Sequence, residues 1–502
     1  MKRVKLFGKL ILIFTMMTLI LTVSVFGKNA KKSVSNEKVI KTLMGVDLDS
    51  LNPYKMVSSA SEEIMMNVYE GLVMPSEDGG IKPAIAESYS VSEDGLTYKF
   101  KIRKGIKFHN GNPLDIKDVE YSLNRMAGKD VDKVSSSAFI NIDKIIVDNE
   151  DEVNIVLTKP DSSFIYHMIE GIIPDENKEN LEKIAIGTGP FKVSEYEKEY
   201  GIVLEKFDDY WGEKAKIDKV DIKIAPDSGM RFLKFLSGEI DILTHIDAKR
   251  VNELKDHTVV SGPQNLVFLL ALNHKFTPFS DKRVREAINL VVDKEKLITT
   301  ALDGYGVPLE TNMSPAMKEV CIDNIGHKTD IEKAKALLKE AGQENLKFTL
   351  RTSTLSSIYT NSAQVLKEQL KEVGITVEIE TMEWATWLDE VYTGKKHEAT
   401  VIGLSGKLDP EPILIRYTTP YAKNFFNYSN KEYDDLIEKA KITNNDAERI
   451  LIYKKAQEIL RDDNAAVYLV DPDMLVGMKK GIKGYVFYPL AYMNFAKLTI
   501  ED

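Results

Sequence analysis

The stretch Leu346–Glu380, LKFTLRTSTLSSIYTNSAQVLKEQLKEVGITVEIE, decides the class of the fold. Leu346–Thr352 and Thr376–Glu380 alternate apolar and polar side chains, which is the period of a strand. Between them, Asn361–Gly374 repeats apolar residues at helical spacing and ends in glycine. A strand, an amphipathic helix and a second strand in this order predict a βαβ unit with parallel strands.

The same alternation extends through the second half of the chain. Leu266–Asn273, LVFLLALN, is a nearly continuous apolar run and predicts a buried strand. Asp281–Asp293 predicts a helix capped by Ser280 or Asp281, and Thr329–Gly342 predicts a helix with a capping box from Thr329 to Glu332. Together these segments predict an α/β sheet with helices on both faces.

The first half has a different pattern. Leu96–Arg103 alternates as a strand, and Asn112–Met126 has helical spacing. Ser59–Val73, SASEEIMMNVYEGLV, predicts a helix with Ser61 as its N-cap and Gly71 near its end. This half therefore predicts an α+β unit.

Composition limits the function. The chain has 502 residues, 43% of them hydrophobic, which is enough for more than one core. Its formal net charge of -10 makes it a poor partner for nucleic acid. Cys321 is the single cysteine of the sequence, so an internal disulfide is excluded.

The N-terminus predicts export. A basic start is followed by the uncharged run Leu10–Phe26, LILIFTMMTLILTVSVF, and by small residues near Gly27. This layout predicts a signal peptide over residues 1–27. No cysteine follows the apolar run to carry a lipid anchor, so we expect a free periplasmic protein.

The sequence carries no catalytic, metal or cofactor motif. It has no H-E-x-x-H, no G-x-S-x-G and no P-loop, and its seven histidines are scattered singly. The segment GLSGK differs from a nucleophile elbow because Lys407 stands where that motif has its last glycine. We therefore expect a protein that is not an enzyme and that needs no cofactor.

Six segments carry a family resemblance. They occur in this order: LDSLNPY, VYEGLV, IKPAIAESYSVSEDGLTYKFKIRKGIKFHNGNPLDIKDVEYSL, GTGPFKV, RVREAINLVVDKEKLI and EWATWLDEVYTGKKHEATVIGL. From about residue 38 to the C-terminus the chain resembles the bacterial extracellular solute-binding proteins of family 5. That family includes dipeptide-, oligopeptide-, glutathione- and nickel-binding receptors of ABC importers.

The resemblance implies a two-lobed α/β periplasmic-binding-protein fold of class II, large type, with an extra α+β domain inserted in lobe I. Lobe I would comprise residues 31–53, 187–264 and 473–502, the extra domain 54–186, and lobe II 265–472. The chain would cross between the lobes near Pro263–Leu266 and Asp471–Asp473. It further implies a monomer that encloses a short peptide or peptide-like solute and delivers it to a membrane permease.

One departure from the family pattern concerns the ligand. In the dipeptide-binding branch, the segment that matches Gly403–Pro412 has a tryptophan and then an aspartate that pairs with the ligand's amino group. Here Leu404 replaces the tryptophan, and the aspartate position falls on Lys407, or on Gly406 if the alignment is anchored on Asp409.

Three interpretations of Lys407 stay open. Lys407 binds a carboxylate or phosphate of the ligand, or another acid such as Asp409 or Glu411 takes over the amine, or Lys407 points into water.

Further candidates come from position in the family pattern. Ser58 and Ser59 follow the first strand, Ser405 lies beside Leu404, and Trp384 shares a helical face with Trp387. Glu170 stands where nickel-binding relatives offer an arginine, which lowers the expectation of a nickel-chelate ligand. A receptor for a metal chelate or another anionic small molecule remains the alternative, and a secreted hydrolase or a holdase chaperone ranks lowest.

Overall fold

The computed structural model describes residues 37–501 apart from 57, 130–134, 178–179, 324–325 and 327. The predicted signal peptide, residues 1–27, lies outside the described residues. The described residues from Val39 onward belong to one unit of the fold.

The βαβ unit predicted from Leu346–Glu380 is confirmed. It consists of β15 (Lys347–Ser353), α9 (Ser357–Lys371) and β16 (Thr376–Met382). The two strands run parallel and in register along their full length. The connection is a helix because parallel neighbours need a crossover segment.

The largest sheet in the described part of the chain has eight strands. Its main path is β11-β18-β13-β17-β15-β16, and β12 and β14 also pair with β18. The strands not yet given are β11 (Ile242–Leu243), β12 (His257–Pro263), β13 (Leu266–Leu272), β14 (Gly306–Pro308), β17 (Ala399–Ser405) and β18 (Val467–Lys479).

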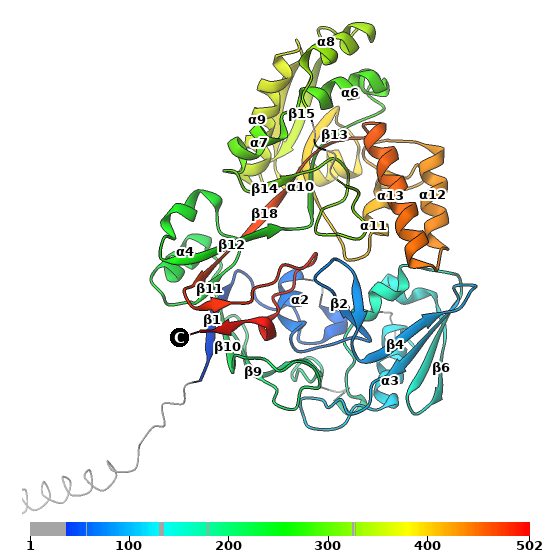
Figure 1. The fold of residues 1–502 in the computed structure, drawn as a ribbon, viewed down its shortest axis with the longest axis vertical. Coiled ribbons are helices and arrows are strands. Elements are labelled where there is room, and N and C mark those ends of the chain that lie inside the picture. The colour runs from blue at the N-terminus through cyan, green and yellow to red at the C-terminus, as the bar shows by residue number, and fades with distance from the viewer. Residues whose placement is uncertain are drawn as a thin grey trace, which may run out of the picture. The chain divides into compact units, whose positions relative to one another are not determined.

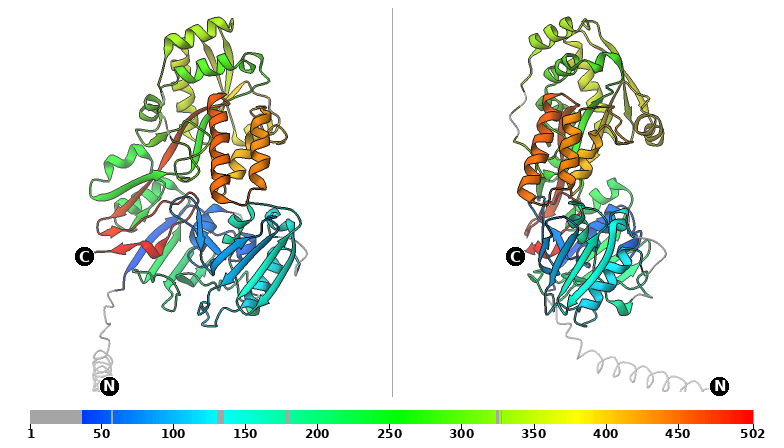
Figure 2. Two further views of the ribbon diagram at one scale, coloured as in Figure 1. Left: turned by 45° about the vertical axis from the view of Figure 1, so that its right-hand side comes forward. Right: turned by 90° about the vertical axis from the view of Figure 1, so that its right-hand side faces the viewer.

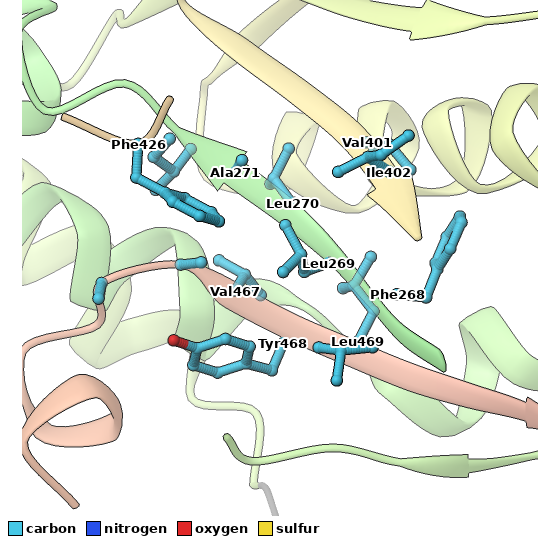
Figure 3. Packing of buried hydrophobic residues seen from close by; sticks show 14 of the residues in the cluster. Phe268, Leu269, Leu270, Ala271, Val401, Ile402, Phe426, Val467, Tyr468 and Leu469 are labelled. Carbon is cyan, nitrogen blue, oxygen red and sulfur yellow. The ribbon is translucent and has the colours of Figure 1, made fainter. Parts of the chain in front are cut away.

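Strand β13 lies between β17 and β18 and is antiparallel to both. Figure 3 shows its side chains packing against those of Val401, Ile402, Val467 and Leu469. From Val267 to Leu272 every residue of β13 is buried. The predicted continuous apolar strand is confirmed, because helices cover the sheet and leave no wet face.

Helices pack around this sheet (Figures 1 and 2). They are α5 (Thr277–Ser280), α6 (Lys282–Val291), α7 (Lys294–Ala301), α8 (Ile331–Glu340), α10 (Trp384–Trp387), α11 (Glu411–Leu414), α12 (Lys431–Lys441) and α13 (Asp446–Asp462). Of the two predicted caps of α6, Ser280 and Asp281, it is Asp281 that caps the helix. The predicted capping box of α8 is wrong, because the side chain of Asp330, one residue after Thr329, accepts the Lys333 amide at 2.9 Å.

Strand β18 has 13 residues and changes partners along its length. Its first half pairs with β13 and β14, and from Asp473 onward it pairs with β12 and β11. Strands β12 and β13 are consecutive in the chain, and Pro263 pairs with Asp473. The segments Pro263–Leu266 and Asp471–Asp473 therefore run side by side.

The remaining strands form smaller sheets. One has the order β1-β10-β9-β8 and another β4-β5-β7-β6. Their bounds are β1 (Val39–Met44), β4 (Ala86–Val91), β5 (Thr97–Ile102), β6 (Ile142–Asn149), β7 (Glu152–Leu157), β8 (Phe191–Glu197), β9 (Gly201–Lys206) and β10 (Lys219–Ile224). Two short pairs are β2 (Val73–Pro75) with β3 (Ile81–Pro83) and β19 (Ile482–Lys483) with β20 (Thr499–Ile500).

Two helices accompany these sheets, α2 (Ser59–Met65) and α3 (Ile116–Met126), whereas α4 (Ser228–Leu236) packs beside β11 and β18 of the eight-stranded sheet. The predicted N-cap and end of α2 are wrong. Ser58 caps it, whereas the Ser61 hydroxyl is buried and accepts the Asp49 amide at 3.0 Å. Gly71 does not end the helix: a Cβ there would lie 2.2 Å from the carbonyl oxygen of Met168, so close packing explains the glycine.

The buried apolar residues of the described chain form four clusters. The largest draws its members from residues 267–470, and another from residues 72–172. A third joins β1, α2 and β8–β10 to the end of the chain, and the smallest surrounds Phe235 beside β18. The residue boundaries predicted for the lobes and the extra domain stay a prediction.

Candidate ligand site at the end of β17

The candidate residues from Leu404 to Glu411 follow the carboxyl end of β17. Strand β15 is parallel to both β16 and β17, so the carboxyl ends of the three strands share one edge of the sheet. Ser405 ends β17, and Trp384 follows the end of β16 by two residues. The topology therefore brings these two candidates to the edge where open α/β sheets bind ligands.

The loop after β17 is held by a buried asparagine. The Gly406 amide donates to the carbonyl of Asn265 at 2.6 Å. The Asn265 side-chain amide donates to the carbonyl of Lys407 at 3.3 Å and to that of Pro489 at 2.7 Å. A Cβ at position 406 would lie 2.0 Å from the Asn265 side chain, so this close approach needs glycine.

Lys407 is exposed on this fixed loop, while Leu408 and Asp409 after it are buried. Burial raises the pKa of the Glu62 carboxyl on α2, and the positive charge of Lys407 opposes that rise. The Lys407 ammonium therefore lies within electrostatic range of α2. Leu404 is half-buried and packs on the largest apolar cluster.

Asp409 and Glu411 lie at a contact between two parts of the chain. Asp409 is 5% exposed, and its carboxyl accepts the Glu411 amide at 3.0 Å. Burial raises the pKa of Asp409 to about 7, and a hydrogen bond with Ser163 opposes the rise. Glu411 is half-buried, with its carboxylate 3.9 Å from the Lys441 ammonium. Nearby, the Ser162 amide donates to the Lys441 carbonyl at 3.1 Å.

The serine candidates belong to the start of α2. Ser58 caps the helix, and its amide donates to the Asp49 carboxylate at 2.9 Å. Ser59 is exposed in the first turn. Capping accounts for the Ser58 hydroxyl, and Ser59 stays a candidate.

Glu170 belongs to an acidic group that sequence reasoning only partly found. Burial raises the pKa of Glu170 to about 7, and the negative charge of Glu62 adds to that rise. Burial also raises the pKa of Glu63, the residue after Glu62, to about 7. The helical pattern of α2 predicted its apolar face but gave no sign that Glu62 comes within electrostatic range of Glu170.

The two tryptophans of α10 stack on each other. Their ring centroids lie 5.1 Å apart, with 4° between the planes. Trp387 is 1% exposed and donates its indole N–H to the Thr400 hydroxyl at 2.9 Å, so it is a core residue. Trp384 covers it from outside and is partly exposed.

Arg416 is a site residue that the sequence did not single out. Its guanidinium donates to the carbonyl of Ser405 at 2.9 Å and is half-buried. Burial lowers its pKa. No pattern in the sequence predicts that this arginine returns to the end of β17, because the turn after α11 sets its position.

Clusters of metal ligands and membrane-spanning helices are both absent from the described residues. No group of three or more histidine, cysteine, aspartate or glutamate side chains there is arranged to hold a metal ion. Across the same residues, no helix combines the length and apolarity needed to cross a membrane.

Comparison with known proteins identifies the family. Residues 80–425 match the model of the bacterial extracellular solute-binding proteins, family 5, middle region. The dipeptide-binding protein of Escherichia coli (strain K12) is 29% identical over 461 residues, covering 84% of this chain and 86% of that protein. The dipeptide-binding protein DppE of Bacillus subtilis (strain 168) is 28% identical, covering 93% of each chain.

Solved structures agree with the predicted fold. DppA from Helicobacter pylori, in complex with the peptide STSA, has a TM-score of 0.69 at 28% identity and covers 92% of this chain and 98% of that one. The ABC transporter substrate-binding protein CtaP from Listeria monocytogenes has a TM-score of 0.81 at 26% identity and covers 93% and 100%.

These matches confirm the predicted two-lobed α/β binding-protein fold and the role as a solute-binding receptor. All the relatives named here are binding proteins. The family model spans more than half of the sequence. The chain therefore belongs to family 5 of the bacterial extracellular solute-binding proteins, as its six sequence segments predicted.

Proposed function

We propose that this receptor binds a short peptide between its two lobes and delivers it to the permease of an ABC importer. The observation that carries the proposal is its similarity, over most of its length, to dipeptide-binding proteins and to a structure that holds the peptide STSA. No observation in the described chain favours a metal chelate over a peptide.

A hinge between the lobes is part of the proposal. Lobe I is taken as residues 31–53, 187–264 and 473–502, the extra domain as 54–186, and lobe II as 265–472. The adjacent segments Pro263–Leu266 and Asp471–Asp473 are then the crossings, and lobes joined by such crossings close when the ligand adds contacts to the closed state.

The proposal also covers the cellular location and the partners of the protein. The predicted signal peptide supports export to the periplasm, where a monomeric receptor meets both its ligand and the permease. The acidic composition supports a protein without nucleic-acid partners. We assign the site to binding rather than catalysis.

The first test is native mass spectrometry of the protein as purified, followed by denaturation to release bound molecules. Peptide masses, or tight binding of peptides from a synthetic tripeptide library by the emptied protein, are the expected results. A bound metal chelate together with no binding of any library peptide would overturn the peptide assignment.

A further inference from the structure

We propose that Lys407 and Arg416 form a two-cation subsite at the end of β17 that binds a carboxylate of the peptide ligand. The inference rests on the proposed peptide-binding function and adds to it the charge of the group that lobe II recognises.

Both cations are fixed to the same short stretch of backbone. Arg416 donates to the carbonyl of Ser405 at 2.9 Å, and the carbonyl of Lys407 accepts the Asn265 side-chain amide at 3.3 Å. Gly406 lies between these two anchor points and donates its amide to Asn265. The backbone of the loop is thus preorganised, so ligand binding does not lose conformational entropy by ordering it.

Among the described residues no carboxylate forms a hydrogen bond or ion pair with Arg416, and the Lys407 ammonium interacts with the Glu62 carboxyl only at longer range. A guanidinium carries five N–H donors, and Arg416 uses one hydrogen bond to protein within that part. A partly desolvated cation without a counter-charge is unfavourable, so an anion that pairs with it adds binding free energy.

Two buried arginines show how this chain satisfies guanidinium groups. Arg285 is 5% exposed and donates to the backbone carbonyls of four residues, Phe279, Ser280, Asp463 and Asn464. Arg449 is also 5% exposed and donates to the Thr443 carbonyl and, at 2.6 Å, to the Asp446 carboxylate. Arg416 differs from both, because its one hydrogen bond to the described residues goes to the Ser405 carbonyl.

The expected ligand group is a carboxylate. A planar guanidinium donates two parallel hydrogen bonds to a carboxylate, and the ammonium of Lys407, which lies on the same loop, would add a point charge. A peptide offers this group at its C-terminus or on an aspartate or glutamate side chain. An ammonium at the same place would be repelled by both cations.

A competition experiment tests the subsite. The emptied protein is offered a tripeptide library without acidic residues, in equal amounts as C-terminal carboxylates and C-terminal amides, and native mass spectrometry measures the ratio bound. A second library, amidated throughout, carries either glutamate or glutamine at one position. Wild type should prefer the carboxylate form in at least one library by roughly tenfold or more.

Single-residue variants test whether Lys407 and Arg416 cause the preference for the carboxylate form. Lys407→Met and Arg416→Gln should each reduce it severalfold, whereas Lys431→Met on α12, also an exposed lysine, should leave it unchanged. Lys407 is exposed, so its variant tests the subsite even if Arg416→Gln fails to fold. Equal binding of both forms by wild type, or an unchanged ratio in Lys407→Met, would overturn the inference.

Attraction between Lys407 and Glu62 is the competing explanation, since their charges interact without a ligand. In that case Lys407→Met and Glu62→Gln would weaken binding of carboxylate and amide forms equally, and the ratio would stay at its wild-type value. The subsite predicts that Glu62→Gln retains or increases the carboxylate preference. If no library peptide binds at all, the proposed function itself fails, which is a different outcome from an unchanged ratio.

Discussion

Asp471 shows how much a single buried side chain connects in this protein. It is fully buried, and one carboxylate oxygen accepts the amides of Gln264 and Leu266, each at 3.2 Å. The other oxygen accepts the Ser314 hydroxyl. One carboxylate thus joins the two adjacent crossing segments that we propose as the hinge.

Asp471→Asn should destabilise the protein by about 2 kcal/mol. An NH₂ group that points to Gln264 and Leu266 faces two amide donors, and one that points to Ser314 removes the acceptor of that hydroxyl's hydrogen bond. Urea unfolding at pH 7 measures the loss, and Asp473→Asn, a half-buried neighbour, is the control with a smaller effect. Equal stability of Asp471→Asn and wild type would show that the carboxylate does not stabilise this junction.

Strand β18 is the element that most depends on its surroundings. It leaves the partners β13 and β14 and continues beside β12 and β11 without a break. Gly477 lies in this second part, and a Cβ there would stand 2.6 Å from the ring of Phe235 and 2.7 Å from Ile246. The glycine allows the strand to pack against the small apolar cluster beside it.

Gly477→Ala should therefore cost about 1–3 kcal/mol of stability through overpacking. Phe235→Leu, which shortens the opposing side chain, should cost stability alone but recover part of the loss in the double variant. Calorimetry of the two single variants and the double variant measures this coupling. Strictly additive losses would contradict the proposed clash.

At the scale of the whole molecule, Asp409 lies where two separately packed parts of the chain meet. Residues 161–163 adjoin the cluster of residues 72–172, and α11 and α12 belong to the largest cluster. Besides the Ser162 amide, the Ser162 hydroxyl donates to the Ala440 carbonyl at 3.1 Å. Asp409 is buried beside this contact.

The pKa of Asp409 makes this contact depend on pH. Because burial raises its folded pKa to about 7, well above the unfolded value, the folded state binds this proton more tightly. The group therefore stabilises the fold at pH 5 relative to pH 8, and that stabilisation is lost as pH rises through 7.

Asp409→Asn removes the titration. The free energy of unfolding of the variant, taken relative to that of wild type, should be lower at pH 5 than at pH 8 by about 2 kcal/mol. Comparing the variant with wild type at each pH cancels the effects of histidines and other carboxyls. The same difference at both pH values, measured by urea unfolding, would show that Asp409 titrates normally.

Local patterns predicted much of the fold correctly. The alternation in Leu346–Glu380 gave the βαβ unit, and the apolar run of β13 gave a strand covered on both faces. The errors were at helix ends, where Ser58 rather than Ser61 and Asp330 rather than Thr329 supply the caps. Several adjacent side chains can cap a helix, and neighbouring backbone decides which one does.

The sequence by itself determined the class of the protein, its family and the position of Lys407 after a strand, because periodicity and family segments are local properties. The tertiary structure alone decided the surroundings of that lysine. It brought Arg416 to the Ser405 carbonyl and Asn265 to the Lys407 carbonyl, and it placed Asp409 at a buried contact. Asn265 and Lys407 lie 142 positions apart, and Arg416 and Ser405, although only 11 positions apart, meet through the turn after α11. Only the packing of the folded chain brings such groups within hydrogen-bonding distance.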